Sequence, residues 1–118
     1  MKLSNTSNKK KILILIVSNY CWTIYNFRLA LINDLLGHGF EVYLIAKKDK
    51  YSKQLTKIGC KLKTIDIDLN GKNVLLDFIT ITKFYVNIKN INPDLCILYT
   101  IKPNIYGSTV CAILNIKY

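Results

Sequence analysis

The sequence predicts an α/β fold, a Rossmann-like doubly wound parallel sheet with the strand order 3-2-1-4. Short apolar runs alternate with longer segments of helical period, which is typical of repeated βαβ units. The first run, at 12–17, is continuously apolar, as a strand covered by helices on both faces requires. Half of the 118 residues (51%) are hydrophobic, enough for one domain with a core.

The first half of the chain is predicted to form two consecutive βαβ units. They follow a polar, basic tail at 1–10 that we expect to be disordered. The domain therefore comprises 11–118. Its expected elements are a strand at 12–17, a helix at 23–36, a strand at 40–46, a helix at 51–58 and a strand at 61–67. Thr23 is the expected N-cap of the first helix, whose apolar face is formed by Ile24, Phe27, Leu31 and Leu35. The mixed polar content of 61–67 predicts an edge strand.

The second half contains one ambiguous segment, 74–90, after a turn at Asn70 and Gly71. Its residues favour strands, but Leu75, Phe78, Ile81, Tyr85 and Ile88 fall on one helical stripe. Because the segment is also too long for a typical strand, we expect a helix that ends at Asn92 and Pro93. A strand at 94–99, a loop at 100–103 and a helix at 105–116 follow.

The chain is strongly basic. Seventeen Lys and Arg residues against seven Asp and Glu give a formal net charge of +10. This charge favours an anionic partner such as phosphate, nucleic acid or an acidic lipid surface, although codon bias in an AT-rich genome is an alternative source of the lysines. The lysine clusters are not interleaved with aromatic residues, which disfavours nucleic-acid binding.

The four cysteines and the single histidine, His38, have no metal-ligand spacing, so we expect neither a metal site nor a cofactor. Cys96 and Cys111 lie in apolar stretches and are expected to be core thiols, which fits a cytoplasmic protein. The apolar run at 12–17 is too short for an export signal, and no stretch is long enough for a membrane span.

The strand order predicts a binding site where the chain reverses direction between strands one and four. There the loops at 18–22 and 99–104 would face each other. Neither contains a Rossmann or P-loop glycine motif, although the helix starts near Thr23 and Asn104 could attract an anion. The aromatic residues Tyr20 and Trp22 suggest a sugar or an acyl chain lying against the first loop.

Several side chains have both a binding and a structural interpretation. Arg28, the only arginine, could hold a phosphate or carboxylate, or could be a solvated helix residue. Lys102 is either a binding-site lysine or an ordinary surface lysine, and Tyr99 either contacts the substrate or covers the core. Tyr106 either offers its ring or hydroxyl to a ligand or only packs in the core. Gly107 within the last helix suggests a close approach by another backbone or a ligand.

Two segments, KILILIVSNYCWTIYNFRLALINDLLGHGFEVYLIAKKD and NPDLCILYTIKPNIYGS, resemble the amino-terminal domain of family 4 glycosyltransferases of the GT-B fold, in particular enzymes acting on lipid-linked sugars. The most specific part of the resemblance is TIKPNIYG after a strand. It implies a retaining transfer from a nucleotide-sugar to a lipid-linked or polysaccharide acceptor. It also implies that the amino-terminal domain holds the acceptor, whose side of the cleft would be lined by Asn19, Tyr20, Arg28, Thr100, Lys102 and Asn104. Tyr99 and Tyr106 are added to the acceptor-binding candidates from their positions in and after the last strand.

The sequence departs from that family because it stops after the fourth βα unit, without the donor-binding second domain. We therefore expect a domain that is inactive alone: a truncated product, a fragment or one subunit of a split enzyme. The nucleotide-sugar would bind through a missing carboxyl-terminal domain or a partner chain. The alternative is a non-catalytic subunit that docks a donor-binding partner. The resemblance further implies a peripheral position on the anionic inner face of the cytoplasmic membrane, and the fourth strand should have an unpaired flank.

Overall fold

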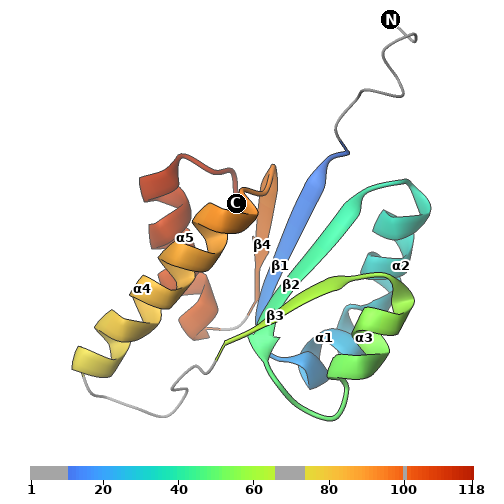
Figure 1. Ribbon diagram of the computed structural model, residues 1–118, viewed down its shortest axis with the longest axis horizontal. Helices are drawn as coiled ribbons and strands as arrows, with labels where there is room; N and C mark the ends of the chain where they lie inside the picture. Colours follow the sequence, from blue (N-terminus) through green and yellow to red (C-terminus); the bar gives the residue numbers. More distant parts are fainter. Residues whose placement is uncertain (1–10, 66–73, 100) are drawn as a thin grey trace, which may run out of the picture.

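Four parallel β-strands form one sheet in the order β3-β2-β1-β4 in the computed structural model, which describes residues 11–65, 74–99 and 101–118 (Figure 1). The strands are β1 (Leu13–Tyr20), β2 (Glu41–Lys47), β3 (Lys61–Thr64) and β4 (Leu95–Leu98). β1 pairs with both β2 and β4 and therefore lies in the interior of the sheet. The doubly wound, Rossmann-like parallel sheet and its order 3-2-1-4 are confirmed.

Helices cover both faces of the sheet. One face carries α1 (Cys21–Phe27), α2 (Leu29–Gly37) and α3 (Ser52–Ile58), and the other carries α4 (Val74–Ile91) and α5 (Ile101–Leu114) (Figure 1). Only the backbone is described for 74–77 and 101–104. None of the described helices is long and apolar enough to cross a bilayer.

The side chains of β1 alternate between two cores. Leu15 and Val17 are fully buried under α4 and α5, whereas Ile14 and Ile16 pack with residues of α1, α2 and α3. The continuous apolar run at 12–17 thus belongs to a strand that is covered on both faces, as its composition predicted.

The helix expected at 23–36 is wrong in two respects. The structure divides it into α1 and α2, with a break at Arg28, and the first helix begins at Cys21 rather than at Thr23. The N-cap is Tyr20, whose side chain makes no capping hydrogen bond. Within α1, Ile24 is buried but Phe27, the last residue before the break, is 63% exposed, so the expected apolar stripe is not the buried face.

The ambiguous segment at 74–90 is helical, and α4 extends to Ile91. The expected apolar stripe is only partly correct. Phe84 and Ile88, one turn apart, are fully buried, whereas Phe78 is 69% exposed. The helix ends as predicted, since Asn92 follows with φ of 50° in the left-handed region.

β3 is the edge strand that the sequence predicted, and two of its four residues are exposed lysines. Lys61 pairs with Glu41 of β2, with 2.9 Å between Nζ and Oε1. Such lysines prevent an exposed strand edge from pairing with other chains.

The outer flank of β4 is partly paired. Lys117 forms a parallel bridge with Leu95, and its carbonyl accepts a hydrogen bond from the Cys96 N–H at 2.8 Å. The expectation of a wholly unpaired flank is therefore wrong at this position. The expected tail at 1–10, the turn at Asn70 and Gly71, the end of the strand expected at 61–67 and Thr100 lie outside the described residues.

Candidate functional site

The carboxyl ends of β1 and β4 lie side by side. The backbone N–H of Tyr99, just beyond β4, donates a hydrogen bond to the carbonyl of Val17 in β1 at 2.9 Å. The helices that follow these strands, α1 and α5, start at this same edge of the sheet (Figure 1). Ligands of open parallel sheets bind at such an edge, where the strand order reverses. We call the residues Ser18, Asn19, Arg28 and Tyr99 the β1–β4 corner.

β1 bulges where it reaches this corner. Its pairing with β2 runs from Val17 opposite Ile45 to Tyr20 opposite Lys47, so two residues, Ser18 and Asn19, face Ala46 alone. A bulge bends the strand and changes the direction of its side chains, and bulges are frequent next to binding sites. The loop expected at 18–22 is absent, because the strand continues to Tyr20 and the helix begins at Cys21.

The start of α1 is held by an acidic side chain from the segment after β2. Asp49 Oδ2 accepts a hydrogen bond from the N–H of Trp22 at 2.7 Å, and its Oδ1 accepts one from the N–H of Tyr51 at 2.8 Å. The N–H of Asp49 in turn donates to Ser52 Oγ at 3.1 Å. An internal carboxylate therefore lies at the helix start where the sequence suggested an external anion.

The break between α1 and α2 directs Arg28 toward β4. Helical hydrogen bonds surround the break, from the Arg28 N–H to the Ile24 carbonyl at 2.9 Å and from the Ile32 N–H to the Arg28 carbonyl at 3.0 Å. The guanidinium carbon lies 4.0 Å from the centroid of the Tyr99 ring. This cation–π stack connects the segment after β1 with the segment after β4.

Three polar atoms at the corner are buried without a hydrogen-bond partner: Ser18 Oγ, Asn19 Oδ1 and Arg28 Nε. Ser18 is fully buried, whereas Asn19 and Arg28 are half-buried. Buried polar atoms are nearly always paired, because an unpaired one loses its hydrogen bonds to water without replacement. These unpaired atoms, two in the bulge of β1 and one at the break between α1 and α2, are the strongest indication of a ligand site in the described part of the chain.

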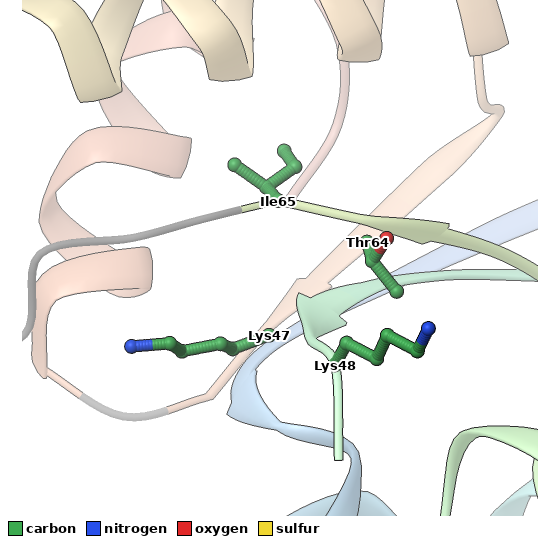
Figure 2. Close-up of a pocket in the computed structure, with 4 residues that line it drawn as sticks. All are labelled: Lys47, Lys48, Thr64 and Ile65. Atoms are coloured by element: carbon green, nitrogen blue, oxygen red, sulfur yellow. The ribbon is translucent and has the colours of Figure 1, made fainter.

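A hollow of about 230 Å³ lies farther along the same edge, at the ends of β2 and β3 (Figure 2). It is lined by Lys47, Lys48, Thr64 and Ile65. Figure 2 shows the two lysine side chains pointing in opposite directions. Lys47 Nζ lies 5.9 Å from the Tyr20 ring centroid, which places this positive charge beside the bulge.

Of the side chains selected from the sequence, the structure brings Arg28 and Tyr99 into direct contact. Asn19 and Tyr20 lie in the bulge of β1, where Tyr20 is paired with Lys47 of β2. Tyr106 lies elsewhere, 9% exposed in the core, with its ring centroid 6.4 Å from that of Phe84. Trp22 is exposed and packs edge-on against Phe27, with 5.5 Å between ring centroids.

The segment after β4 differs from the loop expected at 100–103. The helix α5 begins at Ile101, so Lys102 and Asn104 belong to its first turn. Their side chains, and Thr100, lie outside the described part of the structure. Gly107 does lie close to another group: a Cβ added there would be 2.6 Å from Cδ2 of the Leu98 side chain, so the protein group that it approaches is a side chain rather than a backbone.

Sequence reasoning missed Ser18 and Asp49. The spacing of Asp49 and Ser52 before a helix is a capping signal that could have identified the helix start. Nothing in the sequence indicates that Asp49 also reaches Trp22. Ser18 gave no signal, because a serine after an apolar run usually marks the end of the strand.

The four cysteines are free and buried, and Cys96 and Cys111 are the core thiols that the sequence predicted. A hydrogen bond with Cys111 and burial raise the pKa of the Cys96 thiol, while the same contact lowers the pKa of Cys111. Within 11–65, 74–99 and 101–118, no group of three potential ligands from His, Cys, Asp and Glu could hold a metal ion.

No protein-family model and no curated protein sequence matches this chain. Its fold is nevertheless similar to solved structures. MurG from Acinetobacter baumannii aligns over 91% of this chain and 33% of its own, with 15% identity and a TM-score of 0.65. The calicheamicin glycosyltransferase CalG4 aligns over 92% of this chain and 31% of its own, with 13% identity and a TM-score of 0.63.

A putative UDP-N-acetylglucosamine 2-epimerase from Listeria monocytogenes has a TM-score of 0.68 at 12% identity, over 91% of this chain and 29% of that protein. This chain thus spans about a third of the length of these structures. At such low identities the similarity shows a shared fold, the Rossmann-like arrangement found in GT-B glycosyltransferases.

Proposed function

We propose that residues 11–118 are an acceptor-binding domain of a family 4 glycosyltransferase, which transfers a sugar from a nucleotide-sugar to a lipid-linked or polysaccharide acceptor with retention of configuration. The observation that carries the proposal is the β1–β4 corner, where Arg28 stacks on Tyr99 at 4.0 Å and buried polar atoms lack partners. The fold shared with two glycosyltransferases supports a role in sugar transfer.

In this proposal the acceptor lies along the carboxyl edge of the sheet. Asn19 and Arg28 bind its polar groups, while the exposed ring of Tyr20 gives it a flat surface. Thr100, Lys102 and Asn104 are the further acceptor-binding residues of this proposal; the backbone of Lys102 and Asn104 belongs to the first turn of α5, where N–H groups suit the carrier diphosphate. Tyr106, a buried residue of α5, packs this helix against the core.

Catalysis requires more than this domain. The chain spans about a third of the length of its structural neighbours, and a nucleotide-sugar would bind to a second domain or to a partner chain. The domain alone is therefore inactive. A formal charge of +10 favours residence at the anionic inner face of the cytoplasmic membrane, close to a lipid-linked acceptor.

The test is an NMR titration of the ¹⁵N-labelled chain with farnesyl-diphosphate-linked monosaccharides, and separately with UDP-sugars. We expect saturable shifts at Asn19, Arg28 and Tyr99 with the lipid-linked sugars only, and no transfer when both are present. Arg28→Gln should weaken binding about tenfold, because a charge-assisted hydrogen bond is lost. Lys89→Gln is the matched control, since Lys89 also faces a tyrosine ring, that of Tyr85 at 5.8 Å.

Turnover by this chain alone would refute the assignment of an incomplete site. Shifts at the corner with UDP-sugars but not with lipid-linked sugars would assign the corner to the donor instead. If Arg28→Gln and the unaltered chain bind the lipid-linked sugars with equal affinity, Arg28 does not contribute to acceptor binding.

A second candidate function is a non-catalytic subunit that docks a separate donor-binding chain. The exposed side of α5 favours it: Ile105 is 57% and Ile113 is 65% exposed, next to the partly paired flank of β4. Exposed apolar residues beside a strand edge are typical of an interaction surface.

The test is coexpression with the product of a neighbouring reading frame that encodes a second Rossmann-like domain. A complex that transfers sugar, and that Ile113→Lys disrupts, would support this function. Val86→Lys on α4 is the matched control, because Val86 is 48% exposed on a different helix. A lack of any complex would refute it.

A further inference from the structure

We propose that Cys96 and Cys111 form a redox modification site, a dithiol that a hydroperoxide converts into a disulfide linking β4 to α5. This inference goes beyond the proposed function and does not depend on it. Both thiols are buried in the core on the α4–α5 face of the sheet, at 1% and 0% exposure. The packing of α5 on β4, and the hydrogen bonds of both cysteine backbones to one short segment, carry the inference.

The close packing of α5 on β4 aligns Cys111 with Cys96. A Cβ added at Gly107 would lie 2.6 Å from Leu98 Cδ2, so the glycine allows the helix to lie close to the strand. Cys111 lies four residues after Gly107, on the same side of α5, and Cys96 lies two residues before Leu98, on the same face of β4. Four helical residues and two strand residues both advance about 6 Å. The two cysteines are therefore aligned as Gly107 and Leu98 are, because the helix and the strand run antiparallel.

The residues after α5 demonstrate this antiparallel arrangement. The N–H of Ile116 donates a hydrogen bond to the carbonyl of Cys111 at 2.8 Å. The carbonyl of the next residue, Lys117, accepts one from the N–H of Cys96, also at 2.8 Å. The last turns of α5 thus lie beside the first residues of β4, and one short segment holds the backbones of both cysteines. A disulfide requires such neighbouring backbones.

The two thiols are in hydrogen-bond contact, which makes them chemically unequal. The contact lowers the pKa of Cys111 against the effect of burial, whereas the contact and burial together raise the pKa of Cys96. Because the thiolate is the nucleophile, Cys111 attacks the peroxide and Cys96 resolves the product. The other cysteines differ: Cys21 Sγ accepts a hydrogen bond from Ser52 Oγ at 3.3 Å, and burial raises the pKa of Cys60 to about 11.

The oxidation has two steps. The Cys111 thiolate attacks an oxygen of the hydroperoxide, the O–O bond breaks, and the alkoxide leaves and takes a proton from solvent, so that Cys111 becomes a sulfenic acid. The Cys96 sulfur then attacks the Cys111 sulfur, the S–O bond breaks, and the departing hydroxide takes the Cys96 proton to form water. In total, two thiols and one hydroperoxide give one disulfide, one alcohol and one water. With hydrogen peroxide the products are the disulfide and two waters.

The oxidant reaches the pair through a local opening of the chain. Segment 115–117 is joined to the two cysteines by the two backbone hydrogen bonds at 2.8 Å, and breaking these bonds frees the outer flank of β4. Hydrogen peroxide, which is little larger than water, requires a smaller opening than the disulfide of glutathione does. We therefore expect peroxide to oxidise the pair faster than oxidised glutathione.

The experiment treats the reduced full chain with hydrogen peroxide, blocks the remaining thiols with N-ethylmaleimide in denaturant, and analyses tryptic peptides by mass spectrometry. Trypsin cleaves after Lys89 and Lys117 but not between Lys102 and Pro103, so one peptide, 90–117, contains both cysteines of the pair. We expect this peptide to lose two hydrogen atoms and to take up no maleimide. After reduction with a phosphine it should take up two maleimides.

The rate and the stability of the product are also informative. Free thiol should disappear from Cys96 and Cys111 at least about tenfold faster than from Cys60, whose raised pKa keeps it protonated. The disulfide should raise the midpoint of thermal unfolding by about 5 °C or more, because it closes a loop in the unfolded chain.

Two variants separate the pair from the other thiols. Cys111→Ala removes the nucleophile, so Cys96 should keep its free thiol under the same treatment. The matched control is the double variant Cys21→Ala and Cys60→Ala, because these cysteines are buried in the other core, on the opposite face of the sheet. This control should form the disulfide as the unaltered chain does.

Maleimide on both cysteines of peptide 90–117 after peroxide treatment would overturn the inference, as would a disulfide that includes Cys21 or Cys60. A disulfide that lowers the midpoint of unfolding would also overturn it, because the bond would then distort the contact between α5 and β4. The unaltered chain decides these outcomes even if a variant fails to fold. Binding of lipid-linked sugars by the reduced chain tests the proposed function separately.

Discussion

The carboxylate of Asp49 accepts a hydrogen bond from the backbone N–H of Trp22 at 2.7 Å, across 27 residues of sequence. The other carboxylate oxygen accepts the N–H of Tyr51 at 2.8 Å, at the start of α3. One acidic side chain thus fixes the starts of two helices next to the bulge of β1. The position of the β1–β4 corner depends on this connection, because α1 leads directly from the bulge to Arg28.

Replacing Asp49 should therefore destabilise the fold. Asp49→Ala removes both helix-start contacts, and we expect the free energy of unfolding to fall by about 1–2 kcal/mol. Urea denaturation followed by circular dichroism measures this change. Asp34→Ala is the control, because the Asp34 side chain is 73% exposed and its loss should change stability by less than about 0.5 kcal/mol. Equal stabilities of the two variants would contradict a structural role for Asp49.

The stack of Arg28 on Tyr99 predicts a coupling between these residues. In a double-mutant cycle of Arg28→Gln and Tyr99→Leu, we expect a coupling free energy of about 0.5–1 kcal/mol, because the guanidinium carbon lies 4.0 Å from the ring centroid. Tyr99→Phe keeps the ring and should retain most of the coupling. Additive effects in the cycle would show that the stack does not stabilise the fold.

The topology could be predicted from the sequence because it depends on local patterns. The apolar run at 12–17 and the helical periods after it are visible residue by residue, and right-handed crossovers then leave few strand orders. The end of β1 was missed for a physical reason. Ser18 and Asn19 interrupt the apolar pattern, yet the strand remains paired with β2 through to Tyr20.

The geometry of the candidate site depends on contacts between distant segments, which composition and period do not encode. The apolar pattern continues through 23–36, and nothing local marks the break at Arg28, whose guanidinium meets Tyr99 of a distant segment. Asp49 likewise has a local capping signal but a distant second partner, Trp22. The residue types of the site could be selected from the sequence, but their mutual contacts could not.

A further prediction concerns the effect of a larger side chain at Gly107, because a Cβ added there would lie 2.6 Å from Leu98 Cδ2. Alanine is favoured over glycine in a helix interior by about 1 kcal/mol, but the contact forces the Leu98 side chain to move. We expect Gly107→Ala to bring no stabilisation in the unaltered chain and about 1 kcal/mol in a Leu98→Ala background. Thermal unfolding of both pairs of proteins measures this difference.

The control for this comparison is Gly37→Ala at the end of α2, where an added Cβ meets no atom within 4 Å. Its effect should be the same whether residue 98 is leucine or alanine. An equal effect of Gly107→Ala in both backgrounds would mean that α5 and β4 tolerate the added methyl group without adjustment.

The thiol of Cys60 predicts how stability depends on pH. Cys60 is 5% exposed, and burial raises its pKa from 9.0 to about 11. The folded state therefore favours the protonated thiol more than the unfolded state does, so this contribution to stability is complete below pH 9 and is lost as the pH rises toward about 11. The free energy of unfolding should fall more steeply over this range in the unaltered chain than in Cys60→Ala.

Urea denaturation under reducing conditions at several pH values between about 8 and 11 measures the two slopes. Lysine and tyrosine side chains also titrate in this range, but they are the same in both proteins, so the difference between the curves isolates Cys60. If the curves are parallel, the thiol has a similar pKa in the folded and unfolded chains, and its position beneath α3 must admit enough water to stabilise the thiolate.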